Sequence, residues 1–245
     1  MVINVHGGHN RIVPGASGHL DEVSEDRAVT AQVIDKLWAL GHTVYDCTDD
    51  SGRTQGQNLA NIVRMCNAHA ADLDVSIHLN SGGGTGTEVL VYSDTGAAAG
   101  YAVKICAAIS ELGYRNRGVK ECKNLYVLRR TTAPALLVEC CFVDSAADAQ
   151  RFDADKMAAA IVRGITGQTA AQTGAAPAQQ TGYHVRITAS ILNVRRDHSA
   201  SSAVATQVRK GEVYTIVAEY NNGGTMWGKL KSGAGWIALK YTQCV

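Results

Sequence analysis

An apolar run at residues 135–143, ALLVECCFV, contains one charged residue, Glu139. Runs of this length without polar alternation are typical of strands that are buried on both faces of a sheet. The run therefore predicts a central strand with helices packed on each side. A carboxylate in such a strand costs several kcal/mol unless it is compensated, so Glu139 requires an arginine, a metal ion or a catalytic task. A structural salt bridge is the alternative to a functional role.

The segments around this strand follow a βαβ pattern, because short apolar runs alternate with helical patterns before residue 168. We expect strands at residues 2–5, 42–47, 74–79, 87–92, 125–128 and 135–142, and helices at residues 26–40, 57–69, 97–112 and 154–165. The predicted fold class is α/β, an open twisted sheet covered by helices on both faces. Ligands of such sheets usually bind at the strand ends, where polar residues become the first candidates.

A change of composition divides the chain. Residues 168–182 contain no charge and no large apolar side chain, which is typical of a flexible linker. We therefore expect one domain at residues 1–167 and a second at residues 183–245. The second domain should be a small all-β barrel, because it contains short strands at residues 185–187, 192–195, 212–217, 226–230 and 235–237 and a turn at residues 221–224, NNGG.

The composition, 46% hydrophobic and 18% charged, predicts a soluble globular protein. The chain contains no apolar window long enough for a membrane span and no basic-then-apolar start, so we expect neither a membrane anchor nor a signal peptide. Seven cysteines without a Cys-x-x-Cys pair predict reduced thiols and folding in a cytoplasm. Residues 1–167 carry 15 basic and 19 acidic residues, a net charge of −4, whereas residues 183–245 carry 8 and 3, a net charge of +5. The basic part is suited to an anionic surface but is too weakly charged to indicate nucleic acid.

Three further polar residues lie at the ends of predicted elements: His9, His78 and Glu22. Two histidines and a carboxylate are a usual ligand set for a catalytic zinc ion with an open position, and a second carboxylate such as Glu139 could then transfer protons. Each residue taken alone could instead be a hydrogen-bonded core residue. Since the three come from distant segments, spacing alone does not establish a site.

Four motifs occur in order over most of residues 2–166. They are INVHGGH at residues 3–9 with PGA at 14–16, a glutamate opening a helix before Gly41 and His42, NAHAADLDVSIHLN at residues 67–80, and LYVLR at residues 125–129 followed by PALLVE at 134–139. In these motifs the chain resembles the zinc-dependent N-acetylmuramoyl-L-alanine amidases of bacterial autolysins and phage endolysins. Two departures stand out: the third motif has one extra residue, and His6 stands where the family often has Asp.

The resemblance implies a zinc ligand set and a catalytic residue, namely His9, Glu22 and His78 as ligands and Glu139 as general acid and base. Glu25 competes with Glu22, and an ungapped count back from Gly41 favours Glu22. His6 is the alternative to His9. Weaker candidates are a Cys66 and His69 pair on one helix face and Asn80 as a hydrogen-bond donor near the site.

The last part of the chain is similar to the bacterial SH3-like domains of cell-wall hydrolases. The matching segments are LNVR at residues 192–195, KGE at 210–212, WGKL at 227–230 and GWI at 235–237. This similarity implies a wall-binding domain. Trp227 and Trp236 could be core aromatics, while Tyr214, Tyr220 or Tyr241 could join basic residues in binding wall peptide or glycan.

Together these resemblances imply a peptidoglycan hydrolase that uses zinc-activated water to cleave the amide between N-acetylmuramic acid and L-alanine of the stem peptide. Its expected partner is bacterial peptidoglycan, without nucleic acid or a membrane anchor. The layout favours a phage endolysin that is made in the cytoplasm and acts at the bacterial cell wall after release by a separate membrane-disrupting partner. The alternatives are a host autolysin, a hydrolase of another wall bond, and a catalytically silent wall-binding protein.

Overall fold

A computed structural model describes residues 1–168, 183–222, 225–232 and 234–245 of the chain. The chain divides into two compact units, Met1–Gly174 and Ala175–Val245. The predicted linker, residues 168–182, lies outside the described residues except for Gln168. Within the described part of the chain, none of the helices has the length and apolar character required to span a bilayer.

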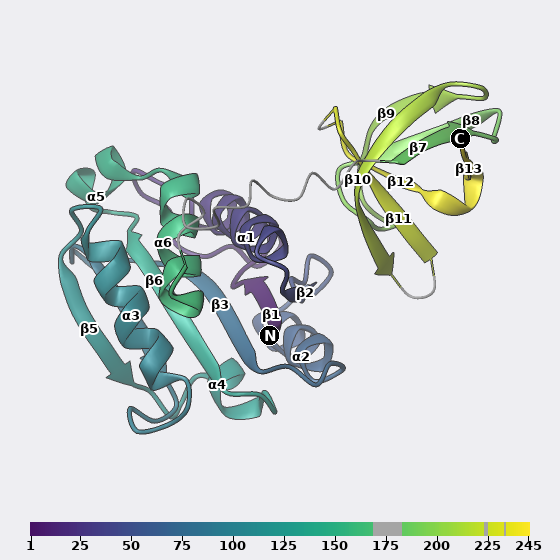
Figure 1. Cartoon of the computed structure of the whole chain (residues 1–245). Helices are drawn as coiled ribbons and strands as arrows, with labels where there is room; N and C mark the ends of the chain where they lie inside the picture. The colour runs from purple at the N-terminus through teal and green to yellow at the C-terminus, as the bar shows by residue number, and fades with distance from the viewer. Residues whose placement is uncertain (169–182, 223–224, 233) are drawn as a thin grey trace. The chain divides into compact units, whose positions relative to one another are not determined.

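The first unit is a six-stranded sheet with helices on both faces (Figure 1). Its strands are β1 (Val2–Gly7), β2 (Thr43–Asp46), β3 (Leu73–Asn80), β4 (Thr87–Val91), β5 (Asn116–Glu121) and β6 (Ala135–Phe142). Its helices are α1 (Glu22–Ala39), α2 (Gln55–Cys66), α3 (Ala99–Ser110), α4 (Tyr126–Arg130), α5 (Ala146–Arg151) and α6 (Ala154–Thr166). The strand order is β2-β1-β3-β6-β4-β5, in which β1, β2, β3 and β6 are parallel and β4 runs antiparallel to β6. The predicted α/β class is confirmed.

Strand β6 is a central strand that is buried on both faces, as its apolar run predicts. Leu136 and Val138 pack into a core cluster with residues of α1, α3 and α6. Ala135 and Leu137 pack into a second cluster, which contains residues of α2 and α4. Because successive side chains of a strand point to opposite faces, both faces require an apolar cover. The unbroken apolar composition of this segment therefore follows from its place in the middle of the sheet.

The predicted strand at residues 125–128 is wrong, because this segment lies largely in the short helix α4. A short apolar run has no period that distinguishes a strand from a buried helical turn. One edge of the sheet is instead formed by β5. Its sequence, NRGVKE, has no apolar alternation, because an edge strand is largely exposed. The short helix α5 was also not predicted. Helix α1 begins at Glu22 rather than near residue 26, since Asp21 Oδ1 caps it by accepting from Ser24 N at 2.9 Å.

The second unit is all-β, as predicted. Its strands are β7 (Tyr183–Ile187), β8 (Ile191–Arg195), β9 (Val204–Arg209), β10 (Val213–Asn222), β11 (Thr225–Leu230), β12 (Trp236–Ala238) and β13 (Thr242–Cys244), with a 3₁₀-helix η1 at Leu239–Tyr241. They form one antiparallel sheet in the order β13-β7-β10-β11-β12-β8-β9. Strands β9 and β13 were not predicted. Of the predicted turn at residues 221–224, the two asparagines end β10 and residues 223–224 lie outside the described residues.

All seven cysteines are free thiols, and five of them are buried: Cys47, Cys66, Cys106, Cys140 and Cys141. Burial raises the pKa of the Cys106 thiol to about 11, so this side chain packs as a neutral, weakly polar group. The prediction that cysteines pack in the core is therefore confirmed for these five, while their reduced state stays a prediction.

One buried carboxyl group lies away from the ends of the strands that carry the candidate site residues. Asn4 of β1 and Asp74 of β3 are partners in register, and Asn4 Nδ2 donates to Asp74 Oδ1 at 2.6 Å. Burial raises the pKa of Asp74 to about 6, against the opposing effect of this hydrogen bond. The folded state therefore holds the proton more tightly than the unfolded state. The contribution of Asp74 to stability is complete below about pH 4 and is lost as the pH rises through about 6.

We expect the substitution Asp74→Asn to increase the free energy of unfolding by about 2 kcal/mol more at pH 8 than at pH 4, because asparagine keeps an acceptor for Asn4 but cannot ionise. Urea unfolding at both pH values measures this difference. Asp94→Asn, which removes an exposed carboxylate, is the matched control and should show no such dependence. An equal effect of Asp74→Asn at both pH values would contradict the interpretation.

Candidate metal centre

Three side chains from distant segments meet beside the carboxyl ends of β1 and β3. His9 follows β1, Glu22 is the first residue of α1, and His78 lies in β3. One ligand atom from each lies within 4.8 Å of the other two. Glu22 Oε1 lies 3.1 Å from His78 Nδ1 and 3.5 Å from His9 Nε2. Two imidazole nitrogens around one carboxylate form a donor set that suits a divalent transition-metal ion.

The carboxylate of Glu22 is held by the backbone on both sides. Its Oε2 accepts from Ala16 N at 2.7 Å, and its Oε1 accepts from Leu79 N at 3.2 Å. Burial alone would raise the pKa of Glu22, but the hydrogen bonds from His78 and Ala16 bring this pKa below its usual value. The side chain is therefore an anion in a fixed position.

Two glycines let the backbone approach these side chains. A Cβ at Gly8 would lie 1.8 Å from Cε1 of the His78 ring, and a Cβ at Gly15 would lie 2.1 Å from Glu22 Oε2. Both distances are far below van der Waals contact, so neither position accepts a side chain without displacing a member of the cluster. The glycines of the HGGH and PGA segments thus have a direct steric role.

The electrostatics of the cluster also fit a cation. Burial lowers the pKa of His78, but the hydrogen bond that its ring donates to Glu22 and the nearby charges of Glu139, Glu22 and Asp26 outweigh burial and raise this pKa. Burial and the neighbouring His78 lower the pKa of His9, which favours the neutral imidazole that binds metals. Several carboxylates therefore gather around a place where positive charge is stabilised, and the residues present fit a divalent metal ion.

Glu139 lies next to this cluster. It pairs in register with His78 of β3 on one side and with Glu88 of β4 on the other. Its Oε2 atom is buried without a hydrogen-bond partner among the described residues. Burial raises the pKa of Glu139 to about 7, against the opposing charge of His78. Arg117 binds the neighbouring Glu88, with Arg117 Nε 2.8 Å from Glu88 Oε2. In the described part of the chain Glu139 itself forms no ion pair with lysine or arginine.

The competing candidates lie outside the cluster. Glu25 is half-buried, and burial with the charge of Asp21 raises its pKa. His6 is buried, its Nδ1 lies 3.2 Å from Gly7 O, and burial lowers its pKa to about 3. Neither residue belongs to the group of ligand atoms that His9, Glu22 and His78 form.

The weaker candidates have other partners. His69 stacks on Tyr45 with 3.6 Å between ring centroids, and Cys66 packs in the core formed with α2 and α4. Among the described residues these two are in no metal-binding group. Asn80 Nδ2 donates to Glu88 Oε1 at 2.9 Å, which places Asn80 beside the carboxylates that flank Glu139.

Two residues of the site were missed from the sequence. Asp26 is fully buried one helical turn after Glu22, and its Oδ2 accepts from His9 N at 3.4 Å. Arg27 donates to Asp26 Oδ1 at 2.9 Å, to Asp50 Oδ1 at 2.8 Å and to the carbonyl oxygen of His9. Arg27 therefore connects α1 to the segment that carries His9. The spacing of Glu22 and Asp26 was the available signal, since residues four apart share one helix face.

A glycine-rich loop at residues 81–86 connects β3 to β4. Asp144 Oδ2 accepts from Gly82 N at 2.9 Å and from Gly83 N at 2.7 Å. Asp148 Oδ2 accepts from Gly86 N at 2.7 Å. Two carboxylates from the segment after β6 thus hold both ends of this loop.

We expect the substitution Gly8→Ala to weaken the binding of a divalent metal ion by about tenfold or more, because the new Cβ displaces the His78 ring and a tenfold loss needs only about 1.4 kcal/mol. Titration of the metal-free protein with Zn²⁺ measures this affinity. Gly100→Ala is the matched control, since a Cβ at this position in α3 meets nothing within 4 Å. Equal affinities of the two variants would remove Gly8 from the description of the site.

The chain is similar to several known proteins. Residues 1–167 match the family described as N-acetylmuramoyl-L-alanine amidase. An uncharacterized protein of Clostridium perfringens is 38% identical over 154 residues, which cover 60% of this chain and 45% of that protein. The sporulation-specific N-acetylmuramoyl-L-alanine amidase of Bacillus subtilis is 31% identical over 209 residues, 83% of this chain and 80% of that protein. The chain thus spans less than half of the first relative and most of the second.

Among solved structures, the catalytic domain of an endolysin targeting Clostridia Difficile is similar to this chain. The TM-score is 0.64 at 26% sequence identity, and the match covers 69% of this chain and 98% of that domain.

Proposed function

Because the chain belongs to the N-acetylmuramoyl-L-alanine amidase family, we propose that it hydrolyses the peptidoglycan amide between the lactyl group of N-acetylmuramic acid and L-alanine of the stem peptide. One observation carries the proposal: His9, Glu22 and His78 come together beside a buried carboxylate, Glu139, whose Oε2 has no hydrogen-bond partner and which forms no ion pair with lysine or arginine among the described residues. Such a carboxylate is costly for stability and suits proton transfer.

In this proposal His9, Glu22 and His78 hold a zinc ion. A zinc ion bound there would polarise the scissile carbonyl and lower the pKa of water to about 7. Glu22 supplies the only carboxylate among the three ligands and is fixed by Ala16 N and Leu79 N. Asp26 accepts from the backbone N–H of His9 and Arg27 donates to its carbonyl oxygen, which keeps this ligand in place.

Glu139 is the proton carrier. In the ionised form it accepts a proton as water adds to the carbonyl carbon, and it then delivers that proton to the nitrogen of L-alanine as the C–N bond breaks. The products are a free amine on L-alanine and the lactyl carboxylic acid, which releases the second proton of the water as it ionises. The pKa of about 7 that burial gives Glu139 lets it both accept and release a proton near neutral pH.

For the whole chain we propose a catalytic domain at residues 1–167, a linker at residues 168–182 and an SH3-like wall-binding domain at residues 183–245, arranged as in a phage endolysin. The all-β fold and the net charge of +5 of residues 183–245 support a wall-binding role. Such a protein is made in the cytoplasm and reaches the wall after release. A host autolysin is the alternative, which the similarity to a sporulation-specific amidase favours.

The bond that is cleaved can be identified chemically. Digestion of purified cell walls should release free amino groups on L-alanine without forming new reducing ends. New reducing ends would indicate a glycosidase, and amino groups on other residues would indicate an endopeptidase. A protein without either activity would be the silent wall-binding protein.

We expect Glu139→Gln to keep the fold and the metal but to lower turnover by about 10²- to 10⁴-fold, because glutamine cannot accept a proton. Turnover on soluble muropeptide and metal content by mass spectrometry give the two readouts. Glu121→Gln, which changes an exposed glutamate at the sheet edge, is the control and should keep full activity. Full activity of Glu139→Gln would remove the proposed role.

The ligand set has its own test. His78→Ala and Glu22→Gln should purify with less than a tenth of the metal of the wild type, since a lost ligand costs well over the roughly 1.4 kcal/mol of a tenfold change. His6→Ala and Glu25→Gln, which change the neighbouring residues outside the cluster, should keep a full equivalent. A metal-replete His78→Ala protein would exclude this residue as a ligand.

A further inference from the structure

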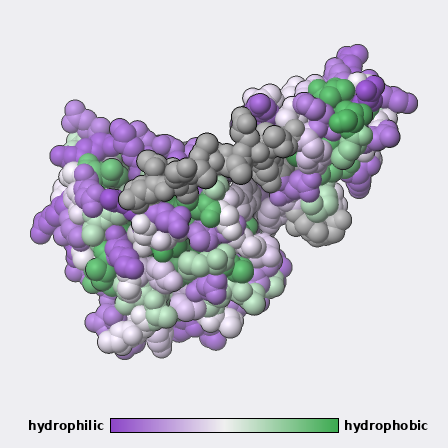
Figure 2. Space-filling view, viewed as in Figure 1, coloured by the Kyte–Doolittle hydropathy of each residue, from purple (hydrophilic) through white to green (hydrophobic). Residues whose placement is uncertain are grey.

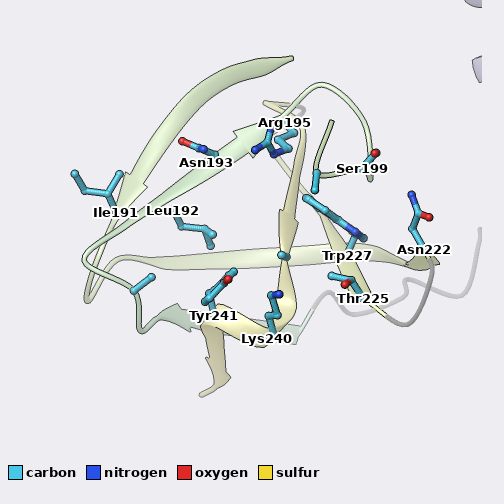
Figure 3. A pocket seen from close by; sticks show the side chains of 13 residues that line it. Ile191, Leu192, Asn193, Arg195, Ser199, Asn222, Thr225, Trp227, Lys240 and Tyr241 are labelled. Atoms are coloured by element: carbon cyan, nitrogen blue, oxygen red, sulfur yellow. The ribbon is translucent and has the colours of Figure 1, made fainter. Parts of the chain in front are cut away.

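The second unit contains a groove of about 490 Å³ (Figure 3). Its walls come from β8, from the facing ends of β10 and β11, and from η1. The side chains that matter here are Ile191, Asn193, Arg195, Trp227, Lys240 and Tyr241. Of the aromatic residues that the sequence singled out, Trp227 is buried at the groove, Trp236 is buried in β12, and Tyr241 is exposed.

The groove is cationic. Arg195 and Lys240 line it, and no aspartate or glutamate is among its lining residues. In the described part of the chain neither cation forms an ion pair: Arg195 Nη1 donates to Ser202 O at 2.5 Å, and Lys240 Nζ lies 5.0 Å from the centroid of the Tyr241 ring. Both positive charges are therefore left for a ligand.

The three acidic residues of this unit are engaged elsewhere. Asp197 pairs with His198, Glu212 accepts from Tyr214 Oη at 2.9 Å, and Glu219 accepts from Tyr183 Oη. None of them lines the groove, so nothing there offsets its positive charge. The charge complementarity favours an anionic ligand.

The groove also has apolar walls. Ile191 is 58% exposed and Tyr241 is 43% exposed, while the buried Trp227 contributes to the lining. Asn193 and Asn222 also line the groove, but their amides already have partners: Asn193 Oδ1 accepts from Gln207 Nε2 at 2.9 Å and Asn222 Nδ2 donates to His198 O at 3.0 Å. A polyphosphate chain would use the two cations but would leave the apolar surface without a partner. A peptide with free carboxylates and apolar side chains would use both.

We propose that this groove binds a short peptide through its free carboxylates, with Arg195 and Lys240 as the anchoring cations. Under the function proposed above, on which this inference rests, the peptide is the stem peptide of peptidoglycan. The groove then holds the same class of molecule from which the first unit separates the glycan. Small apolar side chains such as alanine lie against Ile191 and Tyr241.

The test uses the full-length chain and the synthetic tetrapeptide L-Ala-γ-D-Glu-L-Lys-D-Ala as the probe, with binding measured by calorimetry. The double variant Arg195→Gln/Lys240→Gln should bind at least about tenfold more weakly, since each charge-assisted hydrogen bond contributes well above a neutral one. The control Arg186→Gln/Lys231→Gln removes the same charge from exposed positions outside the groove and should change the affinity less than about twofold.

A second variant guards against misfolding, because Arg195 also supports the backbone at Ser202. Tyr241→Ala changes an exposed side chain, and it should weaken peptide binding while leaving the thermal unfolding temperature unchanged. Equal losses in the groove variant and its charge-matched control would indicate non-specific attraction and overturn the inference. Displacement of the peptide by glycerol phosphate oligomers at equal concentration would overturn the choice of a peptide.

The groove proposal and the amidase proposal can be rejected independently. The groove variants should keep full turnover on soluble muropeptide, because they leave the first unit untouched. Unchanged peptide affinity in the groove variants together with normal turnover would overturn only the groove. A wild-type protein that binds the peptide through Arg195 and Lys240 but releases no L-alanine amino groups would overturn only the amidase proposal.

Discussion

The carboxylate of Glu22 is the point at which three separate segments of the first unit are held together. It accepts from the backbone of Ala16 and Leu79 while it faces the rings of His9 and His78. This geometry depends on the parallel register of β1, β3 and β6. The register brings the two histidines and Glu139 together near the carboxyl ends of these strands. Because these hydrogen bonds fix the carboxylate, the proposed metal binding would require little movement of Glu22. The same hydrogen bonds would therefore serve both the fold and the proposed metal site.

The sequence predicted the centre of this unit better than its margins. Residues 135–142 were predicted as a buried strand because only a position covered on both faces requires such a run, and the structure places β6 there. Residues 125–128 were misassigned because a short apolar segment lacks a defining period, and β5 was missed because an exposed edge needs no apolar pattern. Glu139 was recognised as a candidate functional residue because it is the one charged residue in an apolar run. Glu22 and the two histidines were grouped as polar residues at the ends of elements, but only the family resemblance assigned them as ligands, since no spacing rule links three distant segments.

The residues next to the candidate site make contacts that could not be predicted from residue types or spacing. Arg27 takes part in the site through Asp50 and the carbonyl oxygen of His9, and backbone oxygens leave no trace in residue types. Asp26 had the right helical spacing, but its complete burial depends on how α1 packs against the sheet. In the second unit the strand pattern was readable, whereas the groove arises from β8, the ends of β10 and β11, and η1. Pockets built from turns and strand ends require the tertiary fold to be known.

The glycine-rich loop at residues 81–86 is a segment of the first unit whose length and sequence can change without disturbing the core. In most α/β units a strand at the ligand edge leads into a crossover helix, whose length is fixed by packing on the sheet. Here the chain passes from β3 directly to the antiparallel strand β4, and Asp144 and Asp148 hold the two ends of the loop. An insertion between these two anchor points would lengthen the connection from β3 to β4 without moving a core helix. The loop can therefore diverge in length and sequence while His9, Glu22, His78 and Glu139 keep their positions.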